Sequence, residues 1–212
     1  MIVDCISDLH GFYPDLEGGD LLIVGGDLTA RDTHAEYIQF YSWLHKQKYR
    51  YYIFIAGNHD NLLQKNEVIT SGLANTTYLC DSGTEFEYEE PVRNLFDLND
   101  KSLIYKKKLK IWGSPWTKTF SGMNPRCKAF TVDTDEELAE KWALIPADID
   151  ILITHSPRLD CLDKTIRNES VGSNSLVDAI VRCKNLKLHV YGHIHEAYGQ
   201  EEFAEIIFIN AS

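Results

Sequence analysis

The sequence contains no hydrophobic run that approaches the ~20 residues needed to span a membrane. Its first segment, MIVDCISDLHG, also lacks the basic and apolar regions of a secretory signal peptide. The five cysteines are odd in number and widely spaced, and no C-x-x-C pair occurs, which argues against a disulfide framework. We therefore expect a soluble cytoplasmic protein with reduced thiols and no membrane contact.

Positive charge is scarce as well. The 21 Lys and Arg residues face 32 Asp and Glu residues, and the formal net charge is −11. Proteins that bind duplex nucleic acid gain most of their affinity from basic side chains at the phosphates, so we expect no stable duplex binding. A locally positive site is compatible with an acidic protein, so this charge does not exclude a phosphate ester as substrate.

What the sequence does contain is typical of a globular protein. Hydrophobic residues make up 44% and charged residues 25% of the chain, and 212 residues suffice for one sizeable core. There is no internal repeat and no low-complexity segment. We expect a single domain over residues 1–212.

Short apolar segments bounded by turns alternate with helical segments, which predicts an α/β fold built in layers. The predicted helices are 33–47, 134–143 and 173–183. The predicted strands are 1–7, 21–24, 51–56, 76–80, 102–105, 109–113, 150–155, 186–192 and 205–212.

The first predicted helix, 33–47, has an apolar stripe. Ile38, Tyr41 and Leu44 are spaced three residues apart, and Phe40 precedes Leu44 by four. This spacing places them on one face of a helix, so we expect that face to be buried.

Residues 81–101 differ in composition from the rest of the chain. They hold seven acidic residues against Arg93 and Lys101. We expect an acidic loop or flap, either a solvated excursion or a recognition element.

Five of the predicted strands end in residues that bind metals. The segments are ISDLHG, VGGDLT, IAGNHD, LITHSP and VYGHIH. Ligands of α/β sheets bind beyond the carboxyl ends of the strands, so residues distant in sequence become neighbours there. The candidate ligands are Asp8, His10, Asp27, Asn58, His155, His193 and His195, and His59 and Asp60 lie beside them.

These carboxylates, imidazoles and an amide suit Mn, Fe or Zn, and we expect Mn to support activity in vitro. Seven candidates are too many for one ion but suit two, and the two oxygens of Asp27 suit a bridge. Two divalent ions, Asp8, Asp27 and a bridging hydroxide leave a net charge of about +1, which attracts an anionic phosphate. The same ions should lower the pKa of bound water toward ~7 and so provide a hydroxide nucleophile.

Taken in order, these motifs resemble those of the calcineurin-like metallophosphoesterases: D-x-H, G-D, G-N-H-D, a strand-end His and G-H-x-H. The sequence is most similar to the metallophosphoesterase-domain-containing branch, of the class III cyclic nucleotide phosphodiesterase type. Segments such as TYLCDS, IWGSPWT and KWALIPADIDILITHSP extend the resemblance from end to end. It implies a β-sandwich of two mixed sheets flanked by helices.

The resemblance also implies which ligands serve which ion. The first ion would be held by Asp8, His10 and His195, the second by Asn58, His155 and His193, with Asp27 as the bridge. Some members of the family replace the first His of G-H-x-H by Gly and are weak enzymes. This chain keeps His193, which favours full activity.

Two catalytic residues are implied in the same way. His59 would act on the leaving oxygen or on the phosphoryl charge, and Asp60 would orient it, because a neighbouring carboxylate favours the imidazolium form. One departure from the branch is Ser156, where Gly is usual. Arg31, four residues after Asp27, is either a substrate contact or a solvated side chain.

The activity implied is that of a phosphodiesterase whose metal-bridging hydroxide attacks a small or nucleotide phosphodiester. The strand-end motifs contain no Lys or Arg, and Arg31 and Arg126 are the nearest cations, which favours a monoanionic diester. The alternatives are a phosphomonoesterase or protein phosphatase, whose GDYVDRG motif is absent, and a non-catalytic binding scaffold on the same fold. The sequence does not predict the oligomeric state.

Overall fold

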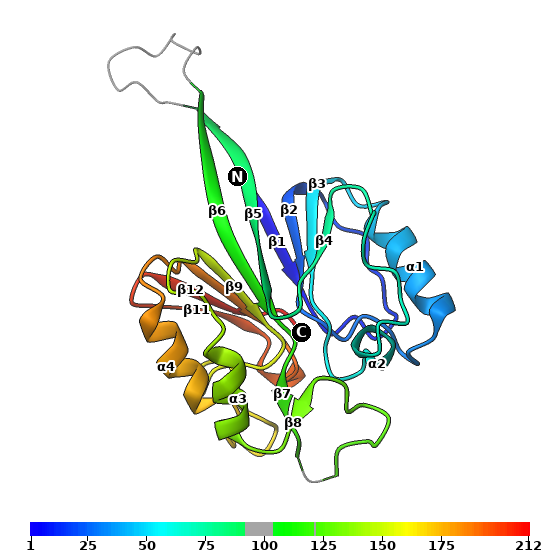
Figure 1. Ribbon diagram of the computed structural model, residues 1–212, viewed down its shortest axis with the longest axis vertical. Coiled ribbons are helices and arrows are strands. Elements are labelled where there is room, and N and C mark those ends of the chain that lie inside the picture. The colour runs from blue at the N-terminus through cyan, green and yellow to red at the C-terminus, as the bar shows by residue number, and fades with distance from the viewer. Residues whose placement is uncertain (92–103, 121) are drawn as a thin grey trace.

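A computed structural model of the chain describes residues 1–91, 104–120 and 122–212. Two β-sheets lie against each other at its centre, and helices cover their outer faces (Figure 1). The α/β layered fold class is therefore confirmed. Within the described residues, no helix combines the length and the apolarity needed to cross a bilayer.

The first sheet contains only parallel strands in the described chain, in the order β1-β2-β3-β4. Its strands are β1 (Val3–Ile6), β2 (Gly19–Val24), β3 (Tyr49–Phe54) and β4 (Thr76–Tyr78). Helix α1 (His34–Leu44) crosses from β2 to β3, and the short α2 (Asn61–Gln64) follows β3. Parallel order brings the carboxyl ends of these strands to one edge of the sheet.

The second sheet is mixed, in the order β11-β12-β10-β9-β6-β5. Its strands are β5 (Ser82–Pro91), β6 (Ile104–Ser114), β9 (Ile151–Thr154), β10 (Leu188–Tyr191), β11 (Gly199–Phe203) and β12 (Ile206–Asn210). The four central strands are parallel, and β5 and β11 add antiparallel edges. The remaining elements are β7 (Thr117–Lys118), β8 (Thr131–Val132), α3 (Asp135–Trp142), α4 (Asn174–Arg182) and the 3-10 turn η1 (His195–Ala197).

Three apolar layers hold the two sheets and the helices together. Alternate residues of one strand point to opposite faces, so Leu21 and Ile23 of β2 pack between the sheets while Leu22 and Val24 pack under α1. Strands covered on both faces require the nearly continuous apolar runs from which they were predicted. Helices α3 and α4 cover the outer face of the second sheet in the same way.

Helix α1 buries Phe40 and Leu44 of the predicted face, and Tyr41 in part, but not Ile38. Tyr37, Phe40, Trp43 and Leu44 are buried, whereas Ile38 is 69% exposed. The buried residues, Tyr37 to Leu44, are spaced three or four apart and face the sheet. Ile38 follows Tyr37 directly, so its side chain points to solvent. The expectation for Ile38 was therefore wrong.

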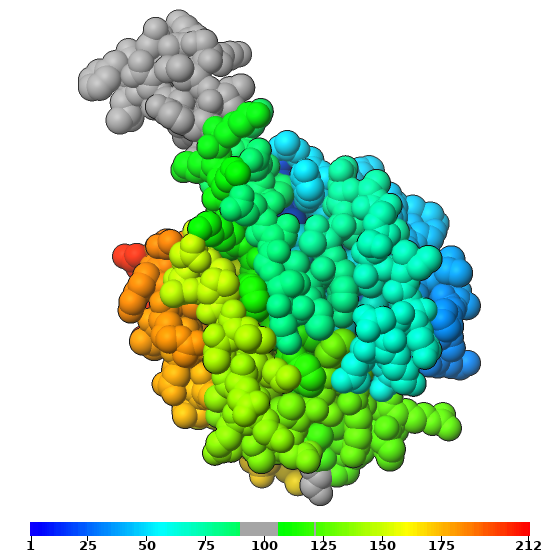
Figure 2. Space-filling model, in the orientation of Figure 1, coloured from blue at the N-terminus to red at the C-terminus, as the bar shows by residue number. Residues whose placement is uncertain are grey.

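The segment expected to be an acidic loop is in part a strand. Residues 82–91 form β5, which pairs with β6 and places Glu85, Glu87 and Glu89 opposite lysines. Lys108 contacts Glu85 at 3.0 Å and Glu87 at 3.1 Å. The hairpin extends beyond the body of the molecule (Figures 1 and 2). Paired opposite charges explain why so acidic a segment is ordered as a strand.

The other half of the hairpin corrects a second expectation. The segments 102–105 and 109–113 were predicted as separate strands, but β6 runs without a break from Ile104 to Ser114. Between them, Lys106 and Lys108 lie opposite Glu89 and Glu87 of β5, so the strand continues through this segment. Residues 92–101, with Arg93 and Lys101, lie outside the described residues.

A buried histidine that is not part of any motif lies inside the second sheet. Thr154 donates its hydroxyl hydrogen to Ser156 O at 2.6 Å, so Nε2 of His189 must donate to Thr154 Oγ1 at 2.8 Å. Nδ1 of His189 has no partner among the described residues. Burial, helped by the charge of Arg158, lowers the pKa of His189 to about 3.

We expect His189→Gln to weaken the acid sensitivity of the fold. Between the ordinary pKa of 6.5 and about 3, the unfolded chain binds a proton at His189 that the folded chain does not, so stability falls as pH falls. This contributes about 2 kcal/mol between pH 8 and pH 5. The free energy of unfolding is measured with urea at pH 8 and at pH 5, with a chelator present. Its loss between the two pH values should be about 2 kcal/mol smaller in the variant than in the wild-type protein. Equal differences in the two proteins would contradict the assignment.

Candidate metal centre

The seven predicted ligands lie in five loops at the carboxyl ends of parallel strands. The first sheet contributes the loops after β1, β2 and β3, and the second sheet contributes those after β9 and β10. Backbone hydrogen bonds join these loops: Asp8 N–H donates to Gly26 O at 3.0 Å, and Gly192 N–H donates to His155 O at 3.1 Å. Ser7 N–H donates to Ala211 O at 2.8 Å, which links the two sheets at the same edge.

Asp27 is at the middle of the cluster. Its carboxylate lies 3.7 Å from Nε2 of His10, 3.8 Å from Nε2 of His59 and 3.5 Å from Nε2 of His155. The side chain is 3% exposed. Three imidazole nitrogens therefore converge on one buried carboxylate, which suits a ligand shared by two ions.

Asp8, His10 and His195 form a second close group. Nε2 of His195 lies 3.2 Å from Oδ1 of Asp8 and 3.4 Å from Nε2 of His10. Their donor atoms all lie within 4.8 Å of one another. This is the trio expected at the first ion.

The residues expected at the second ion, Asn58, His155 and His193, form a less compact group than those expected at the first. Nε2 of His155 lies 3.0 Å from Oδ1 of Asn58, and the His155 and His193 rings are 5.0 Å apart between centroids. Nδ1 of His155 faces Gly25 O at 2.9 Å, which directs Nε2 into the cluster. The backbone N–H of His193 donates to Asp8 Oδ2 at 2.9 Å.

Four of the expected ligands adopt an unusual backbone conformation. Asp8, His10, Asp27 and His193 have φ values of 54°, 43°, 52° and 70°. The left-handed region is disfavoured for residues with a Cβ atom, and such residues cluster at functional sites. The chain turns sharply at these strand ends, and each turn aims a ligand side chain toward its neighbours.

Two glycines fit closely against the buried carboxylates. A Cβ atom on Gly192 would lie 2.0 Å from Asp8 Oδ2, and one on Gly57 would lie 2.2 Å from Asp27 Oδ1. A backbone N–H near each glycine also donates to the carboxylate that the glycine faces. His193 N–H donates to Asp8, and His59 N–H donates to Asp27, each at 2.9 Å. The glycines of the G-N-H and G-H motifs thus allow backbone and carboxylate to meet.

The charges of the centre shift several pKa values. Burial opposes a charge on His155, but the carboxylates of Asp27 and Asp8 outweigh it and raise the pKa of His155 to about 10. Burial and the charge of His155 lower the pKa of His193 to about 4. Burial favours protonated Asp8, yet its hydrogen bond with His195 and the charge of His155 hold its pKa well below the usual range. In the metal-free protein, a proton on His155 thus compensates the buried carboxylates.

His59 lies on the open side of the cluster. Its side chain is 30% exposed, and its ring meets the His10 ring edge-on at 4.6 Å between centroids. Nδ1 lies 3.5 Å from Sγ of Cys127, a contact that no motif of the sequence indicates. Asn58 Nδ2 donates to Cys127 O at 3.1 Å, so this segment supports both residues.

The carboxylate of Asp60 makes its hydrogen bonds with groups other than the His59 ring in the described structure. Its fully buried carboxylate accepts hydrogen bonds from Gly57 N–H at 2.8 Å, Leu28 N–H at 3.2 Å and Tyr37 Oη–H at 3.1 Å. Adjacent side chains in this turn point in different directions, and that of Asp60 points toward α1. It fixes the loops after β2 and β3 instead.

The two candidate arginines lie at the surface. The backbone N–H of Arg31 donates to the Glu36 carboxylate at the start of α1, and Arg126 O accepts from Asn61 Nδ2 at 2.7 Å. Neither side chain has an ion pair among the described residues. The strand-end motifs that carry the ligands contain no Lys or Arg.

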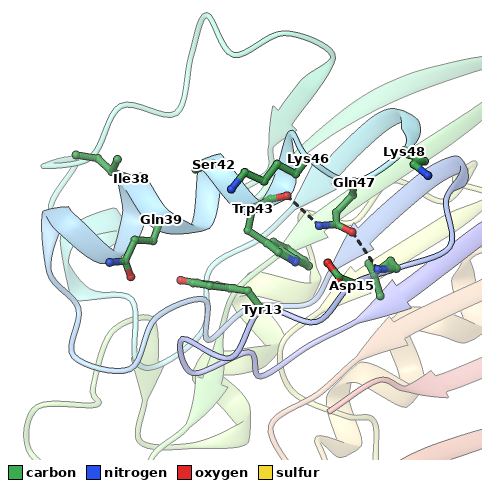
Figure 3. Close-up of a pocket in the computed structure, with 10 residues that line it drawn as sticks. Tyr13, Asp15, Ile38, Gln39, Ser42, Trp43, Lys46, Gln47 and Lys48 are labelled. Carbon is green, nitrogen blue, oxygen red and sulfur yellow. Dashed lines mark hydrogen bonds between the residues drawn. The ribbon is translucent and has the colours of Figure 1, made fainter.

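Two surface hollows differ in their relation to the cluster. One, of about 680 Å³, lies between α1 and residues 13–16, and Trp43 and Gln47 are among the residues that line it (Figure 3). None of the expected ligands lines it. The other, of about 620 Å³, includes one expected ligand, His193, in its wall.

The donor set fits divalent metal ions. Carboxylate oxygens and imidazole nitrogens converge in groups of three with donor atoms within 4.8 Å, including His59 with His10 and Asp27. The amide oxygen of Asn58 lies 3.0 Å from Nε2 of His155. Such a mixture of nitrogen and oxygen donors is typical of Mn, Fe or Zn sites. His59 lies as close to its neighbours as the expected ligands do. The metal content of a protein in which His59 is substituted therefore decides whether His59 is a ligand.

The chain belongs to the calcineurin-like phosphoesterase family, whose model matches residues 1–197. The family predicted from the motifs is therefore confirmed. The metallophosphoesterase domain-containing protein 1 of Homo sapiens and that of Mus musculus are each 35% identical to it over 217 residues. The match covers 98% of this chain but 64% of the length of these relatives.

Other relatives agree in extent and in fold. UPF0046 protein C25E10.12 of Caenorhabditis elegans is 30% identical over 233 residues, covering 98% of this chain and 73% of that protein. The crystal structure of TT1561 of Thermus thermophilus superposes with a TM-score of 0.54 over 98% of this chain and 87% of that one, at 13% identity. At that identity the likeness shows a shared fold.

Proposed function

We propose that this chain is a metal-dependent phosphodiesterase that hydrolyses a small or nucleotide phosphodiester. The observation that carries the proposal is the convergence of carboxylate and imidazole donors from five strand-end loops. Membership of the calcineurin-like phosphoesterase family supports the same class of reaction.

The proposed centre holds two divalent ions, with manganese as the ion that supports activity in vitro. When bound, they supply Lewis acidity toward a phosphoryl oxygen and lower the pKa of a water molecule. Asp27 is the shared ligand. The first ion is assigned to Asp8, His10 and His195, and the second to Asn58, His155 and His193.

The chain's own residues supply the rest of the chemistry. In this proposal His59 gives a proton to the leaving oxygen or stabilises charge on the phosphoryl group, which is supported by its partly exposed ring and by the 3.8 Å between its Nε2 and Asp27. Asp60 acts on the loops that carry Asp27 and His59 and does not itself meet the substrate. Gly25 O holds His155 in the orientation a ligand requires.

We also propose that residues 1–212 form one domain, since a common apolar layer joins the two sheets. The free thiols of the five cysteines support a cytoplasmic location.

We expect a higher kcat/KM on bis-p-nitrophenyl phosphate than on p-nitrophenyl phosphate, at equal Mn²⁺ and neutral pH. The ligand motifs contain no Lys or Arg, so a dianionic monoester gains no further cation from them, whereas a monoanionic diester needs none. The measurement is initial rates on both substrates with one enzyme preparation.

A clear preference for the monoester would assign the protein as a phosphomonoesterase and give Arg31 a role in substrate binding. The absence of turnover on diesters, monoesters and cyclic nucleotides in metal-loaded protein would instead indicate a binding scaffold.

A further inference from the structure

The groove beside His193 has features of a built binding surface. Its volume is about 620 Å³, within the size range of small-molecule sites. The Phe120 ring forms one wall and lies 6.2 Å from the His193 ring between centroids. Phe120 therefore lies next to an expected ligand of the metal centre.

Two large apolar side chains at this groove are left open to water. Phe120 is 57% exposed and Ile166 is 86% exposed. Exposed apolar surface that borders a catalytic site is characteristic of a surface that a ligand covers. The flat face of a phenylalanine ring matches another planar ring better than a flexible aliphatic chain.

The walls of the groove are held by hydrogen bonds. Ile166 N–H donates to the carboxylate of Glu196, the residue after the ligand His195, at 2.9 Å. Lys164 and Ser170 form an isolated β-bridge that closes the loop carrying Ile166. Phe120 follows β7, which pairs with β8. The apolar surface is thus positioned relative to the metal centre.

The charges that line the groove are balanced. Lys118 and Arg167 line the groove, and neither takes part in an ion pair within the described chain. Glu169 and Glu196 also line it, and the carboxylate of Glu196 accepts the hydrogen bond from Ile166. Two cations and two carboxylates leave the lining without net charge, so its exposed apolar side chains are the feature that points to a ligand.

We propose that this groove binds a planar aromatic ring in the organic group of the phosphoester, with Phe120 and Ile166 as specificity-determining residues. The inference rests on the proposed function, because it takes the phosphoryl group to lie at the metal centre. Stacking on Phe120 and contact with Ile166 then select aromatic over aliphatic esters.

The test compares two non-hydrolysable probes that differ only in the ring, phenylphosphonate and methylphosphonate. Isothermal titration calorimetry on the Mn²⁺-loaded protein gives a dissociation constant for each. Because stacking of one ring contributes about tenfold in affinity, phenylphosphonate should bind roughly 10-fold more tightly. Phe120→Ala should reduce that ratio to near one and leave methylphosphonate binding unchanged, and Ile166→Ala should reduce it in part.

Phe203→Ala is the matched control, since Phe203 is similarly exposed but belongs to β11 and does not line the groove. It should keep the wild-type ratio. A ratio near one in the wild-type protein, or an unchanged ratio in Phe120→Ala, would overturn the assignment of the groove. Hydrolysis of bis-p-nitrophenyl phosphate is followed in parallel. A preserved affinity ratio without turnover on any phosphoester would reject the proposed function alone, and turnover with a ratio near one would reject the ring site alone.

Discussion

Asp27→Asn should remove both metal ions together and abolish turnover. The carboxylate is the common neighbour of His10, His59 and His155, at 3.5–3.8 Å from their Nε2 atoms. An amide of the same shape keeps one oxygen but loses the charge and presents hydrogen atoms where the second oxygen stood. The loss of activity should exceed the roughly 10–100-fold effect of changing a residue that only supports a ligand.

The measurement is metal content per chain after Mn²⁺ loading and desalting, with activity on the same samples. His195→Ala provides the contrast: its ring is 55% exposed and contacts Asp8 at the edge of the cluster, so one ion should remain. Asp81→Asn is the control, because that carboxylate accepts hydrogen bonds from Ser114 and Trp116 and belongs to none of the donor groups of the cluster. If the wild-type protein binds no metal, or Asp27→Asn retains two ions, the bridging assignment is wrong.

His59→Ala should retain both ions and the fold but lose turnover by ~10²–10⁴-fold, the range of a positioned acid or charge stabiliser. The ring is partly exposed and leaves a space open to solvent when it is removed. Added imidazole should therefore restore part of the activity, which a purely structural role would not permit. Metal content, circular dichroism and kcat are measured on one preparation.

Two results would contradict this role of His59. Loss of metal from His59→Ala would make His59 a ligand, which its place in a donor trio with His10 and Asp27 also allows. Unchanged turnover would remove it from catalysis. His34→Ala, at a histidine that meets Glu67 O on the surface, is the matched control and should behave as wild type.

The central strands and the positions of the ligands were predictable because both follow from local sequence. Buried strands require apolar runs, and a polar residue directly after such a run lies at the sheet edge whatever its partners are. This sufficed to bring Asp8, Asp27 and His155 together from segments far apart in the chain. It did not reveal the roles of Gly57 and Gly192, because their importance depends on contacts with Asp27 and Asp8 that only the folded chain makes.

The features that were missed depend on pairing between elements. The hairpin of β5 and β6 is encoded by charges opposite each other, and reading one strand at a time shows only an acidic segment and a run of lysines. Ile38 follows the spacing of the buried stripe only in part, and the sheet decides which helix face is covered. The direction of Asp60 and the contact of Cys127 with His59 likewise arise from tertiary packing.

The split of the ligands between two sheets has a consequence for how the molecule comes apart. Asn58 and His155 are 97 residues apart in the chain, and Asp8 and His195 are 187 apart, yet each pair meets at the cluster. An ion held by these residues would cross-link the two halves of the polypeptide and close loops that span most of its length. Opening either sheet would break that coordination, so we expect added metal to make both sheets unfold in one transition and to raise its free energy of unfolding.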